Sequence, residues 1–152
     1  MRILLDTNVL LRLADQEHVQ HPIVRSAIES LDDRDCEMVI VPQVLYECWV
    51  VATRPTDVNG LGVNSSQVDQ MVAEWLELFT LLRDERRVFQ FWRDLVFRYS
   101  VIGKNAHDAR LVAAMLRHGV ADILTFNATD FSRFSLVRVW TPADIVAGKL
   151  PA

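Results

Sequence analysis

Short hydrophobic runs alternate along the chain with longer stretches in which hydrophobic residues recur every three or four positions. The runs are rich in Val, Ile and Leu and predict strands at 2–5, 37–41, 123–126 and 137–140, with a short one at 79–82. The longer stretches predict helices over 7–13, 21–31, from Pro42 onward, from 64 or 65 to 79, from Asp84 to Tyr99 and from 105 or 106 to 118. Loops are predicted at 53–64 and 127–134, and a last helix begins with Thr141 as its cap.

This alternation of strands and helices predicts an α/β fold with a mostly parallel sheet. A chain of 152 residues, of which 51% are hydrophobic, fits one domain over residues 1–152 with a substantial core. In such sheets the functional cleft opens at the carboxyl ends of the strands. Polar residues at those ends are therefore the first candidates for chemistry.

The composition of the chain limits the location and the binding partners that we expect for the protein. The hydrophobic stretches are too short to span a bilayer, and no secretory leader is visible, so we expect no membrane partner and a cytoplasmic location. The net charge of −4 argues against a general electrostatic binder of nucleic acids. Cys36 and Cys48 have no metal-ligand spacing, and Cys48 is expected in the core.

Three carboxylates occupy positions where hydrophobic neighbours predict burial. Asp6 ends the first strand, Glu47 lies between Val44 and Val51 on one helix, and Asp108 begins the hydrophobic stripe of another helix. Two carboxylates about 4 Å apart repel by roughly 4 kcal/mol at an effective dielectric near 20. Such a cluster needs a counter-ion, and Mg²⁺ or Mn²⁺ prefers hard oxygen ligands of this kind. A metal held in this way supports hydrolysis of phosphodiester bonds.

Each of these acids also has a purely structural interpretation. Asp6 could cap the first helix, and Glu47 could pair with a buried arginine. Asp108 lies in the first turn of its helix, where the helix dipole favours an anion. The neighbouring His107 is expected on the surface or behind the metal ligands, since it points about 100° away from Asp108 on the helix.

Four segments resemble, in order, the motifs of PIN-domain ribonucleases. Residues 3–10 read ILLDTNVL, like the opening strand of that family with its first acid. Glu47, after a strand and Pro42, resembles the second acid, and residues 106–114, AHDARLVAA, resemble the helix with the third. Residues 124–131, LTFNATDF, resemble the segment that usually carries the fourth. The resemblance implies a three-layer α/β/α fold with Asp6, Glu47 and Asp108 as catalytic, metal-binding residues.

A single small PIN domain also resembles the VapC-type toxin of a VapBC toxin–antitoxin pair. This resemblance implies an endoribonuclease that depends on Mg²⁺ or Mn²⁺ and cleaves RNA such as transfer or ribosomal RNA. It also implies a homodimer that a cognate antitoxin protein inhibits.

The chain departs from the family pattern at the fourth acid. Asn127 stands where the family often has a carboxylate, and its amide oxygen could bind the metal but brings no charge. Asp130 could supply that charge instead or serve only as a turn residue. Thr7 and Thr125 could bind waters of the metal, although turn stabilisation is the simpler role for both. Asn8 could orient Asp6 or a scissile phosphate.

Aromatic and basic residues have simpler interpretations. Trp49, Trp75 and Trp92 could stack RNA bases, but core or dimer packing is expected for them. The arginines at 83–98 could contact phosphate, but a solvated helix face is expected.

Two other functions remain open at this stage. A non-catalytic PIN-like module that binds RNA or protein would explain Asn127. A phosphorelay receiver would also have acids at strand ends, but it needs an acidic pair after the first strand, and Asp6-Thr7-Asn8 lacks that pair.

Overall fold

The computed structural model describes residues 1–151, so the last residue of the predicted domain, Ala152, lies outside the described part of the chain. The strands are β1 (Arg2–Leu5), β2 (Glu37–Ile40), β3 (Thr80–Leu81), β4 (Asp122–Leu124) and β5 (Arg138–Trp140). The helices are α1 (Thr7–Ala14), α2 (His21–Asp32), α3 (Pro42–Thr53), α4 (Ser65–Leu78), α5 (Arg86–Arg98), α6 (Asn105–His118), α7 (Ala128–Phe131) and α8 (Pro142–Val146), with a 3₁₀ turn η1 (Thr56–Val58). The predicted strands are all present, and their ends differ by one or two residues.

The five strands form one sheet in the order β3-β2-β1-β4-β5, and every neighbouring pair is parallel. The first strand is central: Ile3 pairs with Met38 of β2 on one side and with Asp122 of β4 on the other. A central strand buried on both faces explains why Ile3, Leu4 and Leu5 are all fully buried. The residue that follows β1 is thus surrounded by the ends of both neighbouring strands.

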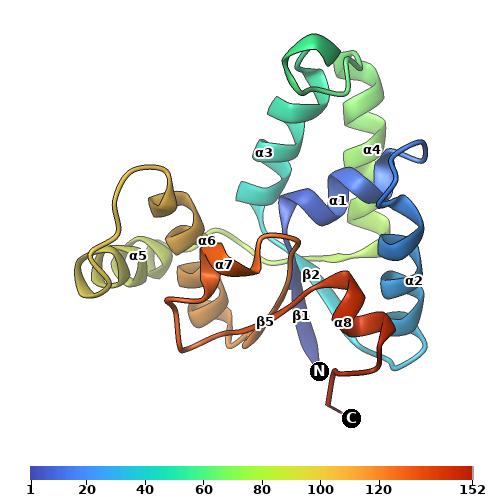
Figure 1. The fold of residues 1–152 in the computed structure, drawn as a ribbon. Coiled ribbons are helices and arrows are strands. Elements are labelled where there is room, and N and C mark those ends of the chain that lie inside the picture. Colours follow the sequence, from blue (N-terminus) through green and yellow to red (C-terminus); the bar gives the residue numbers. More distant parts are fainter. Residues whose placement is uncertain (152) are drawn as a thin grey trace.

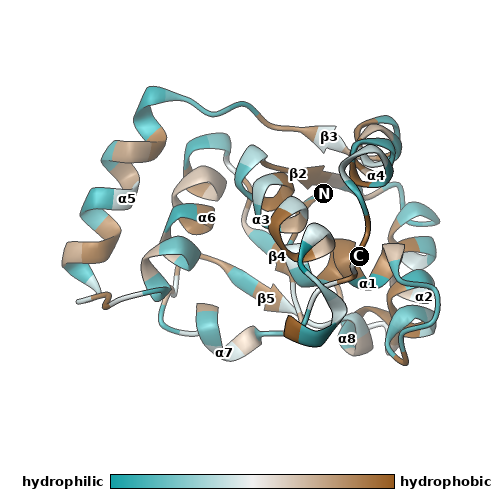
Figure 2. Ribbon diagram, turned by 90° about the horizontal axis from the view of Figure 1, so that it is seen from above, coloured by the Kyte–Doolittle hydropathy of each residue, from teal (hydrophilic) through white to brown (hydrophobic). Residues whose placement is uncertain are grey.

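Helices cover both faces of the sheet. Seen from above the carboxyl ends of the strands, α5, α6 and α7 lie on one side and α1, α2 and α8 on the other (Figure 2). Helices α3 and α4 form a pair that extends upward beyond the carboxyl ends of the strands (Figure 1). The prediction of a three-layer α/β/α fold with a parallel sheet is confirmed.

The core lies between the sheet and these helices, and its extent determines how far each tryptophan is buried. Cys48 and Trp75 are buried, as predicted. Trp92 is half-buried and donates a hydrogen bond of 2.8 Å from Nε1 to the carbonyl oxygen of Ala106. The prediction of a core position is wrong for Trp49, which is 38% exposed. The reason is that α3 rises beyond the sheet, so only part of its surface is covered.

Local capping signals fix several helix ends. Asn64 and Gln67 form a reciprocal capping box at the start of α4, and Thr141 and Asp144 form one at the start of α8. Gly119 ends α6 in the left-handed conformation, with φ of 67°. The predicted cap at Asp84 is wrong, because α5 begins one residue later with Glu85 at the N-cap and Asp84 pairs with Arg110 instead.

The segment predicted as a loop at 127–134 contains the short helix α7. Phe131, at the end of α7, is 1% exposed and anchors this turn in the core. A tertiary contact therefore stabilises a helix too short to form on its own. None of the helices in the described residues is long and hydrophobic enough to cross a membrane.

Candidate active site

Asp6 lies at the carboxyl end of the central strand and is almost completely buried, with 7% of its surface exposed. The last pair of the β1–β4 ladder joins Leu5 and Leu124, so Asp6 and Thr125 follow side by side. The Thr125 hydroxyl donates a hydrogen bond of 2.7 Å to Oδ2 of Asp6, and the Thr7 amide donates one of 2.7 Å to Oδ1. Asp6 is also the N-cap residue of α1, so its structural and chemical interpretations are compatible.

Asn8 and Thr125 connect the ends of β1 and β4 around Asp6. The Asn8 amide nitrogen donates to Oδ2 of Asp6 at 3.3 Å and to the Thr125 hydroxyl at 3.2 Å. Its amide oxygen accepts a hydrogen bond of 3.1 Å from the backbone of Phe126. The Thr125 hydroxyl also accepts a hydrogen bond of 3.0 Å from the backbone amide of Asn127. Thr125 therefore both stabilises its own turn and contacts Asp6. Both side chains fix the orientation of the Asp6 carboxylate.

Glu47 comes from α3 and is held by two side chains. The Thr7 hydroxyl donates a hydrogen bond of 2.6 Å to Oε2, and the Gln43 amide donates one of 3.0 Å to Oε1. The interpretation of Glu47 as the partner of a buried arginine is wrong, since no salt bridge within residues 1–151 reaches it. Thr7 thus links the start of α1 to α3, in addition to any hydrogen bond that it makes in its own turn.

Gln43 is a site residue that the sequence analysis missed. It is buried, and besides contacting Glu47 its amide nitrogen donates a hydrogen bond of 2.8 Å to the carbonyl oxygen of His107. Its amide oxygen accepts one of 3.0 Å from Arg110. Gln43 therefore joins α3 to the part of α6 that carries Asp108. The available sequence signal was a polar residue one helical turn before Glu47 on the same face.

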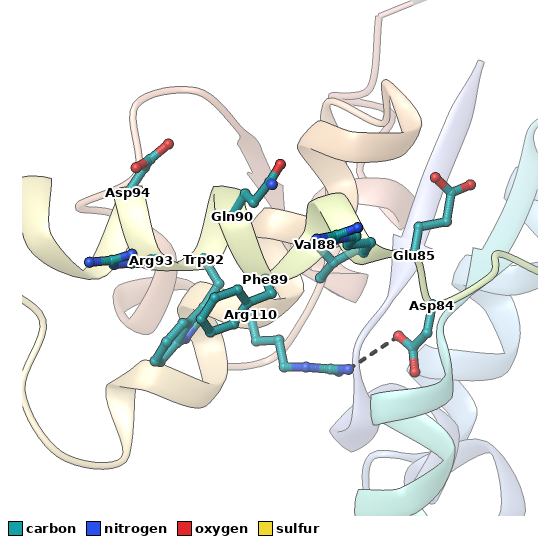
Figure 3. A pocket seen from close by; sticks show the side chains of 10 residues that line it. Asp84, Glu85, Val88, Phe89, Gln90, Trp92, Arg93, Asp94 and Arg110 are labelled. Atoms are coloured by element: carbon teal, nitrogen blue, oxygen red, sulfur yellow. Dashed lines mark hydrogen bonds and ion pairs between the residues drawn. The ribbon is translucent and has the colours of Figure 1, made fainter.

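Beyond Gln43, the network reaches the start of α5. The Arg110 guanidinium bonds Asp84 at 3.2 Å, as the dashed line in Figure 3 shows. Both residues line a cavity of about 850 Å³ between α5 and α6, together with the stacked pair Phe89 and Trp92. The predicted exposure of the α5 arginines is confirmed, and His107 is exposed as expected.

The carboxylates of the site influence one another electrostatically. Burial is the largest cause that raises the pKa of Asp108 to about 6, and the charges of Asp130, Asp6 and Glu47 raise it further. The pKa of Asp6 is raised as well, first by burial, although its hydrogen bonds from Thr125 and Thr7 oppose the shift. Glu47 and Asp130 add to the shift at Asp6 through their charges. The fold thus brings four acids from four segments into one negative field.

Asn127 and Asp130, the two candidates for the fourth position, differ in exposure and in charge. The Asn127 side chain is exposed and makes no capping hydrogen bond to α7. Asp130 is half-buried and is the first charge, after burial, among the causes of the raised pKa of Asp108. Asp130 thus adds negative charge to the surroundings of Asp108, whereas Asn127 brings no charge.

Asp122 is a buried acid with a structural role, and its charge is paired with an arginine. It lies at the amino end of β4, away from the site, and its side chain is 3% exposed. Arg138 donates two hydrogen bonds to it, at 2.9 and 2.7 Å, and Trp140 donates one at 2.8 Å. In contrast, no salt bridge in the described part of the chain reaches Asp6, Glu47, Asp108 or Asp130. The site acids are therefore left with uncompensated charge.

The donor set fits a divalent cation such as Mg²⁺ or Mn²⁺. Oxygen donors without a cationic partner are the ligands that these metals prefer. Across residues 1–151, no three side chains among His, Cys, Asp and Glu lie close enough to form a complete metal cage. Mg²⁺ commonly binds through one or two carboxylates and keeps several waters, so a partial cage of this kind is compatible with it.

Comparison with known proteins identifies the fold family. The family model described as PIN domain matches residues 3–136. No curated protein sequence matches the chain significantly.

Several solved structures have a similar fold, and three of them come from three different bacteria. The structure of VapBC2 from Rickettsia felis bound to a promoter DNA fragment matches 93% of this chain and 98% of its own, with 14% identity and a TM-score of 0.68. A toxin–antitoxin complex from Klebsiella pneumoniae matches 92% and 97%, with 19% identity and a TM-score of 0.64. Mycobacterium tuberculosis VapC20, a toxin that cleaves the sarcin–ricin loop, matches 86% and 92%, with 15% identity and a TM-score of 0.61.

At these identities the structures support the fold, and the family model covers residues 3–136, which include all four acidic segments. The chain therefore belongs to the PIN domain family.

Proposed function

We propose that this protein is a metal-dependent endoribonuclease that hydrolyses phosphodiester bonds of RNA. The observation that carries the proposal is the group of four carboxylates without cationic partners at the carboxyl ends of the strands. Membership of the PIN domain family and similarity to a toxin that cleaves the sarcin–ricin loop support the same activity. Mg²⁺ or Mn²⁺ is the proposed cofactor because the ligand atoms are hard oxygens.

The residues of the chain have distinct proposed roles. Asp6 and Asp108 are the proposed direct ligands of the cation, and Glu47 and Asp130 would bind it through its waters. When bound, the metal would orient and acidify a water and stabilise negative charge on the phosphodiester.

Hydrogen bonds keep these acids in position. Thr125 and Asn8 orient the Asp6 carboxylate, while Thr7 and Gln43 orient Glu47. These contacts fix the carboxylates before any substrate binds and reduce the cost of assembling the site.

The biological role that we propose is that of the toxin in a toxin–antitoxin pair. Structures of such pairs from several bacteria match nearly the whole chain, which supports a cognate antitoxin protein as partner. Transfer or ribosomal RNA in the cytoplasm is the proposed substrate, in line with the toxin that cleaves the sarcin–ricin loop.

A homodimer is part of this proposal. Phe89 is 62% exposed, Phe97 is 88% exposed and Ile102 is 81% exposed, all on or next to α5. Large hydrophobic side chains in such numbers on one helix are typical of a surface covered by another chain.

The test is RNA cleavage by purified variants with Mg²⁺ or Mn²⁺. Asp6→Asn and Asp108→Asn should each lower the cleavage rate by about 100-fold or more, since each removes a charge that holds the metal. Asp32→Asn removes the same charge from an exposed position at the end of α2 and should leave the rate unchanged. Cleavage that persists in both site variants, or in excess chelator, would refute the proposal.

The alternative is a PIN-like module that binds RNA or protein without cleaving, which the amide at Asn127 favours. RNA binding by the unaltered protein with no cleavage under any divalent metal, and no metal binding by calorimetry, would establish that alternative.

A further inference from the structure

A second cavity opens directly beside Glu47. It has a volume of about 380 Å³ and is lined by Thr7 of α1, by Tyr46, Glu47, Val50 and Val51 of α3, and by Arg54, the residue that follows α3. The wall is mostly hydrophobic side chain, and Tyr46 and Val50 are 62% and 56% exposed. Glu47 and Arg54 are the charged residues at its border. The cavity is therefore an extension of the proposed active site, with the positively charged guanidinium of Arg54 at its far end.

Arg54 is the C-cap residue directly after α3, seven residues or about two helical turns beyond Glu47. The helix rise places its Cα roughly 10 Å from that of Glu47. No hydrogen bond or salt bridge found within residues 1–151 occupies the Arg54 guanidinium. A half-buried arginine without a protein partner, beside acids that must accept a polyanion, is available for a phosphate group.

The loop after α3 is packed tightly around the Arg54 backbone. A Cβ atom at Gly60 would lie 1.8 Å from the Arg54 carbonyl oxygen and 2.5 Å from its Cβ, so only glycine fits there. The Gly62 amide donates a hydrogen bond of 2.9 Å to the same carbonyl, and Gly62 itself has φ of +65°. This packing fixes Arg54, the C-cap residue of α3, where a helix end would otherwise fray.

We propose that this cavity binds one nucleotide of the RNA strand next to the cleaved bond, with Arg54 on its phosphate and Tyr46 against its base. The proposal rests on the function proposed above. A guanidinium can donate two parallel hydrogen bonds to a phosphate, and an exposed aromatic ring can stack a base of any identity. The spacing of about two helical turns assigns Arg54 to a phosphate beside the scissile one, not to the scissile phosphate itself.

The test measures binding of a fluorescently labelled, unstructured RNA oligonucleotide by anisotropy, in chelator so that no cleavage occurs. Arg54→Ala should raise Kd by about 10-fold and lower the slope of log Kd against log salt by roughly 0.7, the value for one lost phosphate contact on a single strand. Tyr46→Ala should raise Kd by about 10-fold with the salt slope unchanged, because stacking is uncharged.

Two further variants separate charge from geometry. Arg54→Lys should keep the salt slope but bind more weakly than the unaltered protein, since an ammonium cannot make the two parallel bonds. Gly60→Ala should weaken RNA binding like Arg54→Ala while every charge remains. Arg25→Ala is the matched control, because Arg25 is an exposed arginine of α2 paired with Glu29, and its Kd should stay within about two-fold of the unaltered value.

Mn²⁺ binding by calorimetry and steady-state cleavage complete the test. Arg54→Ala should raise KM with a smaller effect on kcat and should leave Mn²⁺ affinity unchanged, whereas the Asp6 and Asp108 variants lose both metal and cleavage. If RNA affinity and salt slope are unaltered in folded Arg54→Ala and Arg54→Lys, the cavity is not an RNA subsite, and a protein segment becomes its remaining occupant. That result would overturn this proposal without affecting the test of cleavage itself.

Discussion

Replacing Asp108 by Asn should stabilise the metal-free protein at neutral pH, because the fold holds the ionised carboxylate partly buried and near other negative charges. The pKa of Asp108 is raised from 3.8 to about 6, chiefly by burial and then by the charges of Asp130, Asp6 and Glu47. The folded protein therefore binds a proton more tightly than the unfolded chain does. The contribution of this group to stability is fully present below pH 3.8 and is lost as the pH rises through about 6.

The size of the effect follows from the shift. A difference of about two pKa units corresponds to about 3 kcal/mol at 1.36 kcal/mol per unit. Asp108 is only half-buried, and water screens part of the interaction, so we expect about 1–2 kcal/mol. This is the free energy by which ionised Asp108 destabilises the metal-free protein above pH 7.

The assay is urea unfolding in chelator at pH about 4.5 and about 7.5, for the unaltered protein and Asp108→Asn. At the higher pH the variant should be more stable by the amount above, and at the lower pH, which lies between the two pKa values, the difference should fall to roughly one third of it. Asp32→Asn controls for the loss of one charge at an exposed position. A variant that is no more stable than the unaltered protein at pH about 7.5, or an advantage independent of pH, would refute the reasoning.

The remaining predictions concern residues that support the site. Gln43→Leu should lower Mn²⁺ affinity by about 10–100-fold in calorimetry, because Glu47 and the His107 carbonyl lose their shared donor; unchanged affinity would mean that Gln43 does not position the acid. Phe131→Ala should lower the free energy of unfolding by about 3–5 kcal/mol and speed hydrogen exchange in α7, since Phe131 is 1% exposed and anchors that turn. A loss below about 1 kcal/mol would show that α7 does not depend on this anchor.

Much of the fold could be predicted from the sequence because its signals are local. The strand β1 is a hydrophobic run that ends at Asp6, and α4 starts where Asn64 and Gln67 cap each other across three residues. Hydrophobic spacing correctly predicted Trp75 in the core. Each of these features depends on neighbours along the chain, which a sequence displays directly.

Other features depend on contacts between distant segments. Asp84 is a good capping residue, yet it pairs with Arg110, 26 residues further along, and α5 starts without it. Trp49 has the spacing of a core residue, but α3 extends past the sheet that would have covered it. The helix α7 is too short to be marked by periodicity and depends on the burial of Phe131.

The sequence by itself determined that Asp6 would follow the first strand, that Glu47 would lie within the helix after the second strand, and that Asp108 would lie in the first turn of a later helix. Local patterns along the chain mark strand ends and helix starts. Only the tertiary structure decided that the charge of Asp130 reaches Asp108, and that Gln43 joins Glu47 to the helix of Asp108. The physical reason is that charge coupling and hydrogen bonding act over a few ångströms in space. Residues 43 and 107 reach that distance only after the sheet has brought α3 and α6 together.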